Sequence, residues 1–129
     1  MTLDISPIYA GLLALLFLAL SARVIRHRQT ALISVGSKDD LVLLTKMRVQ
    51  ANWAEYAPIG IILLVMAELQ GAPDWAVHVL GAMLLIGRVI HAVGMSRTPQ
   101  RFTLRVMGML LTLAMIALAA LANVGHALI

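Results

Sequence analysis

The hydrophobic positions of this chain form four long, nearly unbroken apolar segments that are separated by short polar stretches. A helix needs roughly 20 mostly apolar residues to cross a bilayer core about 30 Å thick. The segments therefore predict four membrane-spanning helices, at about residues 7–22, 48–69, 75–95 and 102–122. We expect an all-α membrane protein whose single domain, residues 1–129, is a four-helix transmembrane bundle.

The polar stretches predict the connections between these spans. Residues 23–40 contain several Arg and Lys residues together with Gly36, and we predict a loop there. The sequence Gln70-Gly71-Ala72-Pro73-Asp74 is a turn signal between the second and third spans. A short basic connection containing Pro99 leads into the last span.

The charged residues predict the orientation in the membrane. All ten Lys and Arg residues lie within residues 23–48 and 88–105, on one side of the four predicted spans. Asp4, Glu68 and Asp74 lie at the opposite ends of the spans. Because cytoplasmic loops carry an excess of Lys and Arg, we expect the regions 23–48 and 96–105 to be cytoplasmic and both termini to lie on the outer side of the membrane.

The overall composition supports the membrane assignment and excludes several classes of protein. Hydrophobic residues make up 61% of the chain and charged residues only 12%, whereas a soluble domain has about 25% charged residues. The net charge of +4 comes from Lys and Arg residues whose positions indicate the orientation in the membrane, so no nucleic-acid partner is expected. The chain has no cysteine, which excludes disulfides and Cys nucleophiles. No pair of His residues has the spacing of a metal site, and no metal is expected.

Polar residues occupy the beginning of the second span. This span crosses the bilayer only if it extends back to about Gln50, which places Asn52 and Glu55 at hydrocarbon depth. At about 100° per residue, Arg48, Asn52 and Glu55 lie within about 60° on one helix face, and Tyr56 flanks them. Gln50 points the other way, so we expect it to meet a different helix or subunit.

The third span contributes two further polar residues at membrane depth. Arg88 and His91 are three residues apart and are therefore neighbours on one helix face. Gly87, beside them, permits close approach of another helix. Ionisable side chains at this depth usually face the bundle interior or a water-filled cavity.

These charges have a structural and a functional interpretation. In the structural one, Glu55 forms a buried ion pair with Arg48 or Arg88 that fixes the register of the helices. However, Glu55 is the only carboxylate in a region that also contains Arg48, Arg88 and Arg101, with Arg105 at its boundary. Since Arg binds carboxylates through two parallel hydrogen bonds, this excess of guanidinium groups favours an anionic ligand.

The pattern Arg48-x-Gln50-x-Asn52-x-x-Glu55-Tyr56-x-Pro58 resembles the signature of the MAPEG family, the membrane-associated proteins in eicosanoid and glutathione metabolism. The likeness extends over the whole chain and includes Gly-Arg-x-x-His at the end of the third span. More narrowly, the chain is similar to small bacterial inner-membrane members of this family. A location in a bacterial inner membrane is therefore expected, with both termini periplasmic.

The resemblance implies a left-handed bundle that forms a homotrimer and binds glutathione as co-substrate between adjacent subunits. The residues of one subunit that would line the glutathione site are Arg48, Asn52, Glu55, Tyr56, Arg88 and His91. Gln50 would reach the site across the subunit interface. Arg26 or Arg28 matches the basic residue that follows the first span in the family.

The resemblance also implies a catalytic residue. Arg101 matches the Arg at the start of the fourth span that activates the glutathione thiol in the family, and Arg105 is its rival for this role. Met95 stands where some members have a Tyr one turn after the His. This departure favours a general detoxifying transferase or peroxidase over eicosanoid chemistry.

We therefore expect a glutathione-dependent membrane transferase, or a transferase that is also a peroxidase, that acts on lipophilic electrophiles arriving from the bilayer. The first alternative is a non-catalytic thiol- or lipid-binding protein of the same fold. The second is a small multidrug transporter subunit, which is less favoured because the first span lacks the mid-span Glu of such transporters.

Overall fold

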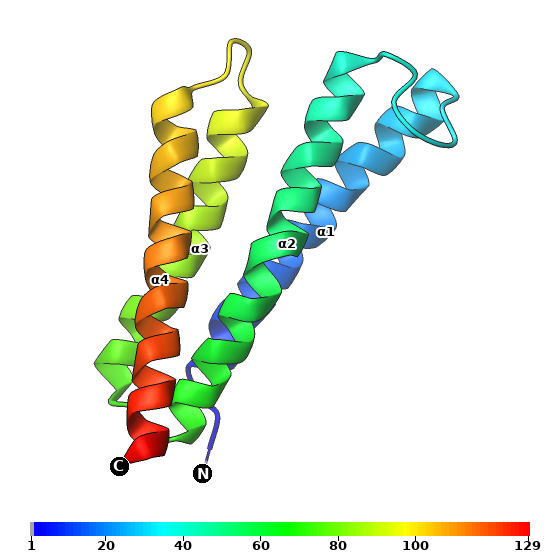
Figure 1. The fold of residues 1–129 in the computed structure, drawn as a ribbon. Coiled ribbons are helices and arrows are strands. Elements are labelled where there is room, and N and C mark those ends of the chain that lie inside the picture. Colours follow the sequence, from blue (N-terminus) through cyan, green and yellow to red (C-terminus); the bar gives the residue numbers. More distant parts are fainter. Residues whose placement is uncertain (1) are drawn as a thin grey trace.

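A computed structural model describes residues 2–129 as a bundle of four helices (Figure 1). The helices are α1 (Ser6–Ala31), α2 (Leu41–Leu69), α3 (Asp74–Ser96) and α4 (Phe102–Leu128). Each is long and apolar enough to cross a membrane. No strand occurs within residues 2–129, and the predicted all-α fold with four spans is confirmed.

The prediction of a loop over residues 23–40 is wrong for its first half. Helix α1 continues through Ala31, and only residues 32–40 connect it to α2. Residues 23–31 contain neither Gly nor Pro, so nothing in them ends the helix. The 26 residues of α1 span about 39 Å at 1.5 Å per residue, which is more than the hydrocarbon core. The Arg-rich end of α1 therefore extends beyond the apolar layer.

Side chains fix the ends of α1 and α2 at this basic end of the bundle. Leu32 adopts a left-handed conformation that ends α1, and the Arg28 guanidinium donates to the carbonyl of Gly36 at 2.8 Å. The Asp40 carboxylate accepts from the backbone N–H of Leu43 at 3.0 Å and caps α2, which begins seven residues before the predicted span. This hydrogen bond, together with one from His27, lowers the pKa of Asp40.

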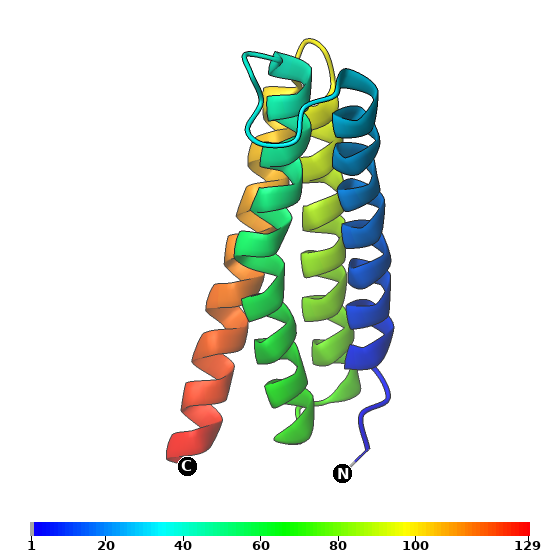
Figure 2. The same ribbon diagram turned by 90° about the vertical axis from the view of Figure 1, so that its right-hand side faces the viewer.

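The four helices form two hairpins, α1 with α2 and α3 with α4 (Figure 1), and all four run along a common direction in the view of Figure 2. In the second hairpin, glycine allows α3 and α4 to touch through their backbones. A Cβ atom on Gly108 would lie 2.6 Å from the carbonyl oxygen of Gly87 and from the backbone nitrogen of His91. The two helices are therefore as close at this point as their backbones allow, as expected from Gly87.

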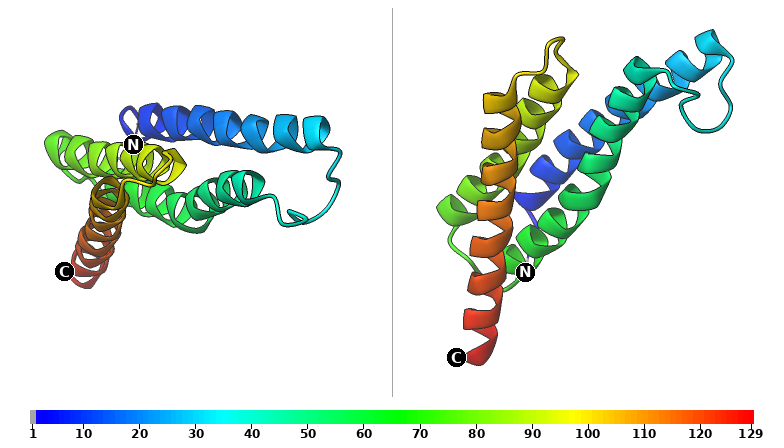
Figure 3. Two further views of the ribbon diagram at one scale, coloured as in Figure 1. Left: turned by 90° about the horizontal axis from the view of Figure 1, so that it is seen from above. Right: turned by 45° about the horizontal axis from the view of Figure 1, so that its top comes forward.

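The hairpins are joined near the chain termini and diverge towards the basic end (Figures 1 and 3). The largest buried cluster contains residues from all four helices, among them Leu13, Leu64, Leu84 and Met115. The next cluster towards the basic end consists of Leu20, Val49 and Ala92, and the last consists of Val24, Ile33 and Leu43. Towards the basic end, the buried clusters thus first lack residues of α4 and then also lack residues of α3.

The start of α1 is held by a residue from the end of α2. The carboxylate of Glu68 accepts hydrogen bonds from the backbone N–H groups of Asp4, Ile5 and Ser6, at 2.9, 2.7 and 2.7 Å. Helix α1 has no side-chain cap of its own and no acidic residue in its first turn. Glu68 therefore satisfies N–H groups that a helix leaves unpaired at its beginning.

Candidate functional site

Arg88 of α3 lies at the centre of a polar cluster inside the bundle. Only 2% of its surface is exposed. Its Nε donates to the hydroxyl of Thr112 on α4 at 2.9 Å, and its Nη1 donates to the side-chain oxygen of Asn52 on α2. The guanidinium carbon lies 5.6 Å from the ring centre of Tyr56, in cation–π range. Three helices thus converge on this one cation.

The local sequence explains how α4 reaches Arg88. The contact between Gly87 and Gly108 brings α3 and α4 together next to Arg88. Thr112, one turn after Gly108, donates its hydroxyl proton to the Gly108 carbonyl at 2.9 Å. A lone pair of the same oxygen is then directed at the guanidinium.

Glu55 does not neutralise Arg88. Its carboxylate pairs with Arg48 at 3.6 Å, and the two side chains are 50% and 53% exposed. The buried ion pair of the structural interpretation is therefore wrong: the pair exists, but it lies on the outer surface of α2. In the part of the chain that the structure describes, Arg88 has no carboxylate within 4.0 Å. Its neighbours are neutral hydrogen-bonding and aromatic groups.

Arg48, Asn52, Glu55 and Tyr56 do share one region of α2, as the helical periodicity predicted. Asn52 and Tyr56 contact the buried cation, and the Arg48–Glu55 pair continues this face outward. His91 follows Arg88 by one turn on α3 and is also buried, with 4% of its surface exposed. The Arg48–Glu55 pair is thus the exposed part of this polar face, whereas Arg88 and His91 are buried.

Gln50, Arg26 and Arg28 lie elsewhere, between α1 and α2. The Gln50 side-chain amide donates to the hydroxyl of Ser21 on α1 at 3.2 Å, which confirms that it points away from Asn52 to another helix. Arg28 contacts the loop after α1 and the sulfur of Met47. Arg26 lines a groove between the two helices. Within one chain these residues and the Arg88 cluster are on different sides of α2.

Arg101 and Arg105 lie at the beginning of α4, beyond His91. The Arg101 backbone N–H donates to the carbonyl of Gly94 at 2.9 Å, and its side chain is exposed. A Cβ atom on Gly94 would lie 2.7 Å from the backbone nitrogen of Arg105. The Arg105 guanidinium donates to Gln100 at 3.0 Å. Both guanidinium groups are thus carried at the same end of the α3–α4 hairpin.

Sequence reasoning missed the contribution of α4 to the cluster. Thr112 accepts from Arg88, and the sulfur of Met109 lies 3.5 Å from its Nη2. Thr112 is fully buried. A hydroxyl residue four positions after a glycine, within an otherwise apolar segment, was the available signal. Of the two threonines in this span, Thr103 and Thr112, only Thr112 has a glycine four positions before it.

The fold and this cluster define an integral membrane protein with four spans and a buried, polar, Arg-centred site. Residues 6–124 match the MAPEG family. The chain is also 36% identical over 122 residues to the inner membrane protein YecN of Escherichia coli strain K12, covering 95% of this chain and 92% of the relative. The YecN protein of Escherichia coli O6:H1 shows the same identity and coverage.

The chain therefore belongs to the MAPEG family, as its second and third spans predicted. It is a membrane protein of the family associated with eicosanoid and glutathione metabolism. The four spans and the inner-membrane relatives confirm the predicted location, an integral protein of an inner membrane. The side of the membrane that each terminus faces stays a prediction.

Proposed function

We propose that this protein is a glutathione-dependent membrane transferase that activates the glutathione thiol for attack on lipophilic electrophiles. The observation that carries the proposal is Arg88, a buried cation without a carboxylate partner in residues 2–129. A buried charge is costly unless it is paired. An anionic ligand that reached Arg88 would supply the missing charge.

The charges around Arg88 suit glutathione, which has two carboxylates and one ammonium group. Arg48 and Arg88 offer two guanidinium groups for the carboxylates, with bidentate geometry. Glu55 can bind the ammonium group when its weak, half-exposed ion pair with Arg48 is broken. Asn52 and Tyr56 add hydrogen-bonding and aromatic surface beside Arg88.

The chemical step needs a thiolate, since the thiolate rather than the thiol is the nucleophile. Arg101 is the proposed activating residue, because an always-protonated guanidinium beside the sulfur favours the charged form. The thiol proton leaves to solvent, the sulfur forms a bond to the electrophilic carbon, and the leaving group departs with the bonding electrons. Arg105 is the rival for this role, because it is carried on the same hairpin end.

We further propose that a homotrimer completes the site. The Arg48–Glu55 pair is half-exposed on the outer face of α2, where a neighbouring subunit would cover it. Gln50, which lies on the opposite side of α2, would then contribute to the site of the adjacent subunit, as would Arg26 or Arg28. A non-catalytic protein that binds a thiol or a lipid in the same site is the second candidate.

The proposal is tested by glutathione binding to the detergent-purified full chain, with ultraviolet absorbance reporting thiolate formation. Replacing Arg48 with Gln removes an exposed contact that the fold does not need, and should weaken binding by about tenfold to a hundredfold, the value of a charged hydrogen bond. The Arg88→Gln variant should bind still more weakly. Lys38→Gln, an exposed loop residue, is the charge-matched control and should bind normally.

The Arg101→Ala variant separates catalysis from binding. We expect it to bind glutathione but to show little thiolate absorbance at neutral pH, whereas Arg105→Ala keeps the absorbance. The reverse result would assign activation to Arg105. Binding without thiolate in the unaltered protein would favour the non-catalytic candidate, and absence of glutathione binding would refute the proposed function.

A further inference from the structure

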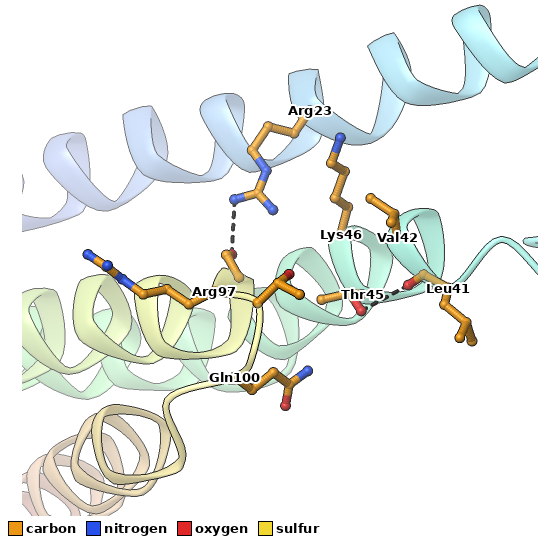
Figure 4. Close-up of a pocket in the computed structure, with 9 residues that line it drawn as sticks. Arg23, Leu41, Val42, Thr45, Lys46, Arg97 and Gln100 are labelled. Atoms are coloured by element: carbon orange, nitrogen blue, oxygen red, sulfur yellow. Dashed lines mark hydrogen bonds between the residues drawn. The ribbon is translucent and has the colours of Figure 1, made fainter.

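A basic pocket lies where the two hairpins diverge, away from the Arg88 cluster. It has a volume of about 280 Å³ and is formed by residues of α1, α2, the end of α3 and the loop before α4. Its lining residues with side chains drawn in Figure 4 include Arg23, Lys46, Arg97 and Gln100. Asn52, Tyr56 and Arg88 are not among the lining residues.

Two cations face this pocket from different helices. Arg23 reaches from α1 towards the end of α3, where its Nη1 donates to the hydroxyl of Ser96 at 3.1 Å (Figure 4). Lys46 reaches from α2 towards α1 and donates to the Nδ1 of His27 at 3.1 Å. Both side chains are half-buried. The pocket lining includes no carboxylate.

Both cations keep hydrogen-bond donors for a ligand. The Lys46 ammonium has three N–H groups, and the contact with His27 uses one of them. The Arg23 guanidinium has five, and the contact with Ser96 uses one. Because the Ser96 hydroxyl oxygen accepts from Arg23, the hydroxyl proton of Ser96 remains available for an acceptor on a ligand. Arg97, in the loop after α3, also lines the pocket.

The edge of the pocket on α2 is apolar. Leu41 and Val42 line it and are 73% and 60% exposed. A ligand that fits this arrangement has an anionic group for Arg23 and Lys46 and an apolar part for Leu41 and Val42. Basic pockets between spanning helices, at the level of the headgroups, bind phosphate-bearing lipids by this combination.

We propose that this pocket is a binding site for a phosphate-bearing ligand, distinct from the site around Arg88. Arg23 and Lys46 hold the phosphate from α1 and α2, and the Ser96 hydroxyl contacts it from α3. A bound phosphate therefore links the two hairpins where their buried core ends. The phosphate comes either from a lipid headgroup or from a free phosphate compound, and the two sources are separable by experiment.

The test is native mass spectrometry of the delipidated full chain in detergent, titrated with phosphatidylglycerol. Diacylglycerol, which lacks the phosphate, is the control ligand. We expect phosphatidylglycerol adducts that diacylglycerol does not form, with affinity reduced about tenfold or more in Arg23→Gln and in Lys46→Gln. Lys46→Arg should retain binding, and Lys38→Gln should leave it unchanged. A helical circular dichroism spectrum and a monodisperse elution profile verify that each variant folds.

Competition then identifies the source of the phosphate. Displacement of the lipid by an excess of inorganic phosphate indicates a free phosphate compound, and resistance to displacement indicates a lipid headgroup. Equal binding of diacylglycerol, equal losses in Lys38→Gln, or displacement by glutathione would overturn the proposal. The last result would show that the pocket belongs to the proposed glutathione site.

Discussion

The carboxylate of Glu68, at the end of α2, accepts a hydrogen bond from the backbone N–H of Ser6, at the beginning of α1, at a distance of 2.7 Å. The two residues are 62 positions apart in the sequence. The same carboxylate also accepts from Asp4 and Ile5. A single side chain thus joins the beginning of α1 to the end of α2, at the end of the bundle that carries both termini.

Replacing Glu68 with Ala should destabilise the protein. The change leaves three backbone N–H groups without their acceptor and removes a negative charge from the positive end of the α1 dipole. We expect a loss of about 1–3 kcal/mol, measured by thermal unfolding in detergent. Glu55→Gln is the control, because its half-exposed pair with Arg48 contributes little. Equal stability of the two variants would contradict a capping role for Glu68.

Replacing Gly108 with Ala should separate α3 from α4. The added Cβ would meet the backbone of Gly87 and His91 at 2.6 Å, and backbone atoms cannot rotate away as a side chain does. Overpacking of this kind costs about 1–3 kcal/mol. Gly11→Ala is the matched control, since a Cβ there meets nothing within 4 Å. Thermal unfolding of both variants measures the difference, and a neutral Gly108→Ala would refute the tight contact.

Thr112→Val tests the support of Arg88 by α4. Valine has nearly the shape of threonine but leaves the Arg88 Nε without its acceptor. We expect a loss of about 1–3 kcal/mol in stability and weaker glutathione binding, because the guanidinium is no longer held in place. Thr112→Ser keeps the hydroxyl and should restore glutathione affinity. If serine and valine behaved alike in a binding titration, packing rather than the hydrogen bond would be the contribution of Thr112.

Asp40 makes the stability of the α1–α2 hairpin dependent on pH. Its pKa in the folded protein is lower than the ordinary value of 3.8, because it accepts from Leu43 and His27. Such a group stabilises the folded state above its unfolded pKa, and the effect is lost as pH falls through the folded pKa. Asp40→Asn should therefore be less stable than the unaltered protein at pH 7 and similar to it in strong acid. Unfolding midpoints at the two pH values measure this, and a pH-independent difference would contradict it.

The sequence predicted the spans and helix faces well because apolar length and 3.6-residue periodicity determine them locally. Helix α3 lies within one residue of the prediction at each end, since a turn signal precedes it and a basic connection follows it. The opposite orientations of Asn52 and Gln50 on α2 also follow from periodicity alone.

The parts that were not predicted depend on groups distant in the sequence or on charged helix ends. The Arg-rich end of α1 remains helical because a helix does not require apolar residues outside the bilayer. The prediction from hydropathy therefore placed the end of α1 too early in the sequence. Thr112 and Glu68 act through contacts that only the packed bundle brings together. The roles in glutathione binding, the trimer and the orientation in the membrane stay predictions.

The divergence of the two hairpins has a mechanical consequence. Because residues from all four helices are buried together only near the termini, rotation of one hairpin against the other can pivot there. Such a rotation would change the separation of Arg23 and Ser96 at the basic end, where the last buried cluster contains no residue of α3 or α4. The two hairpins are thus packed together at one face of the membrane, and at the other the Arg23–Ser96 hydrogen bond is a contact that such a rotation would break.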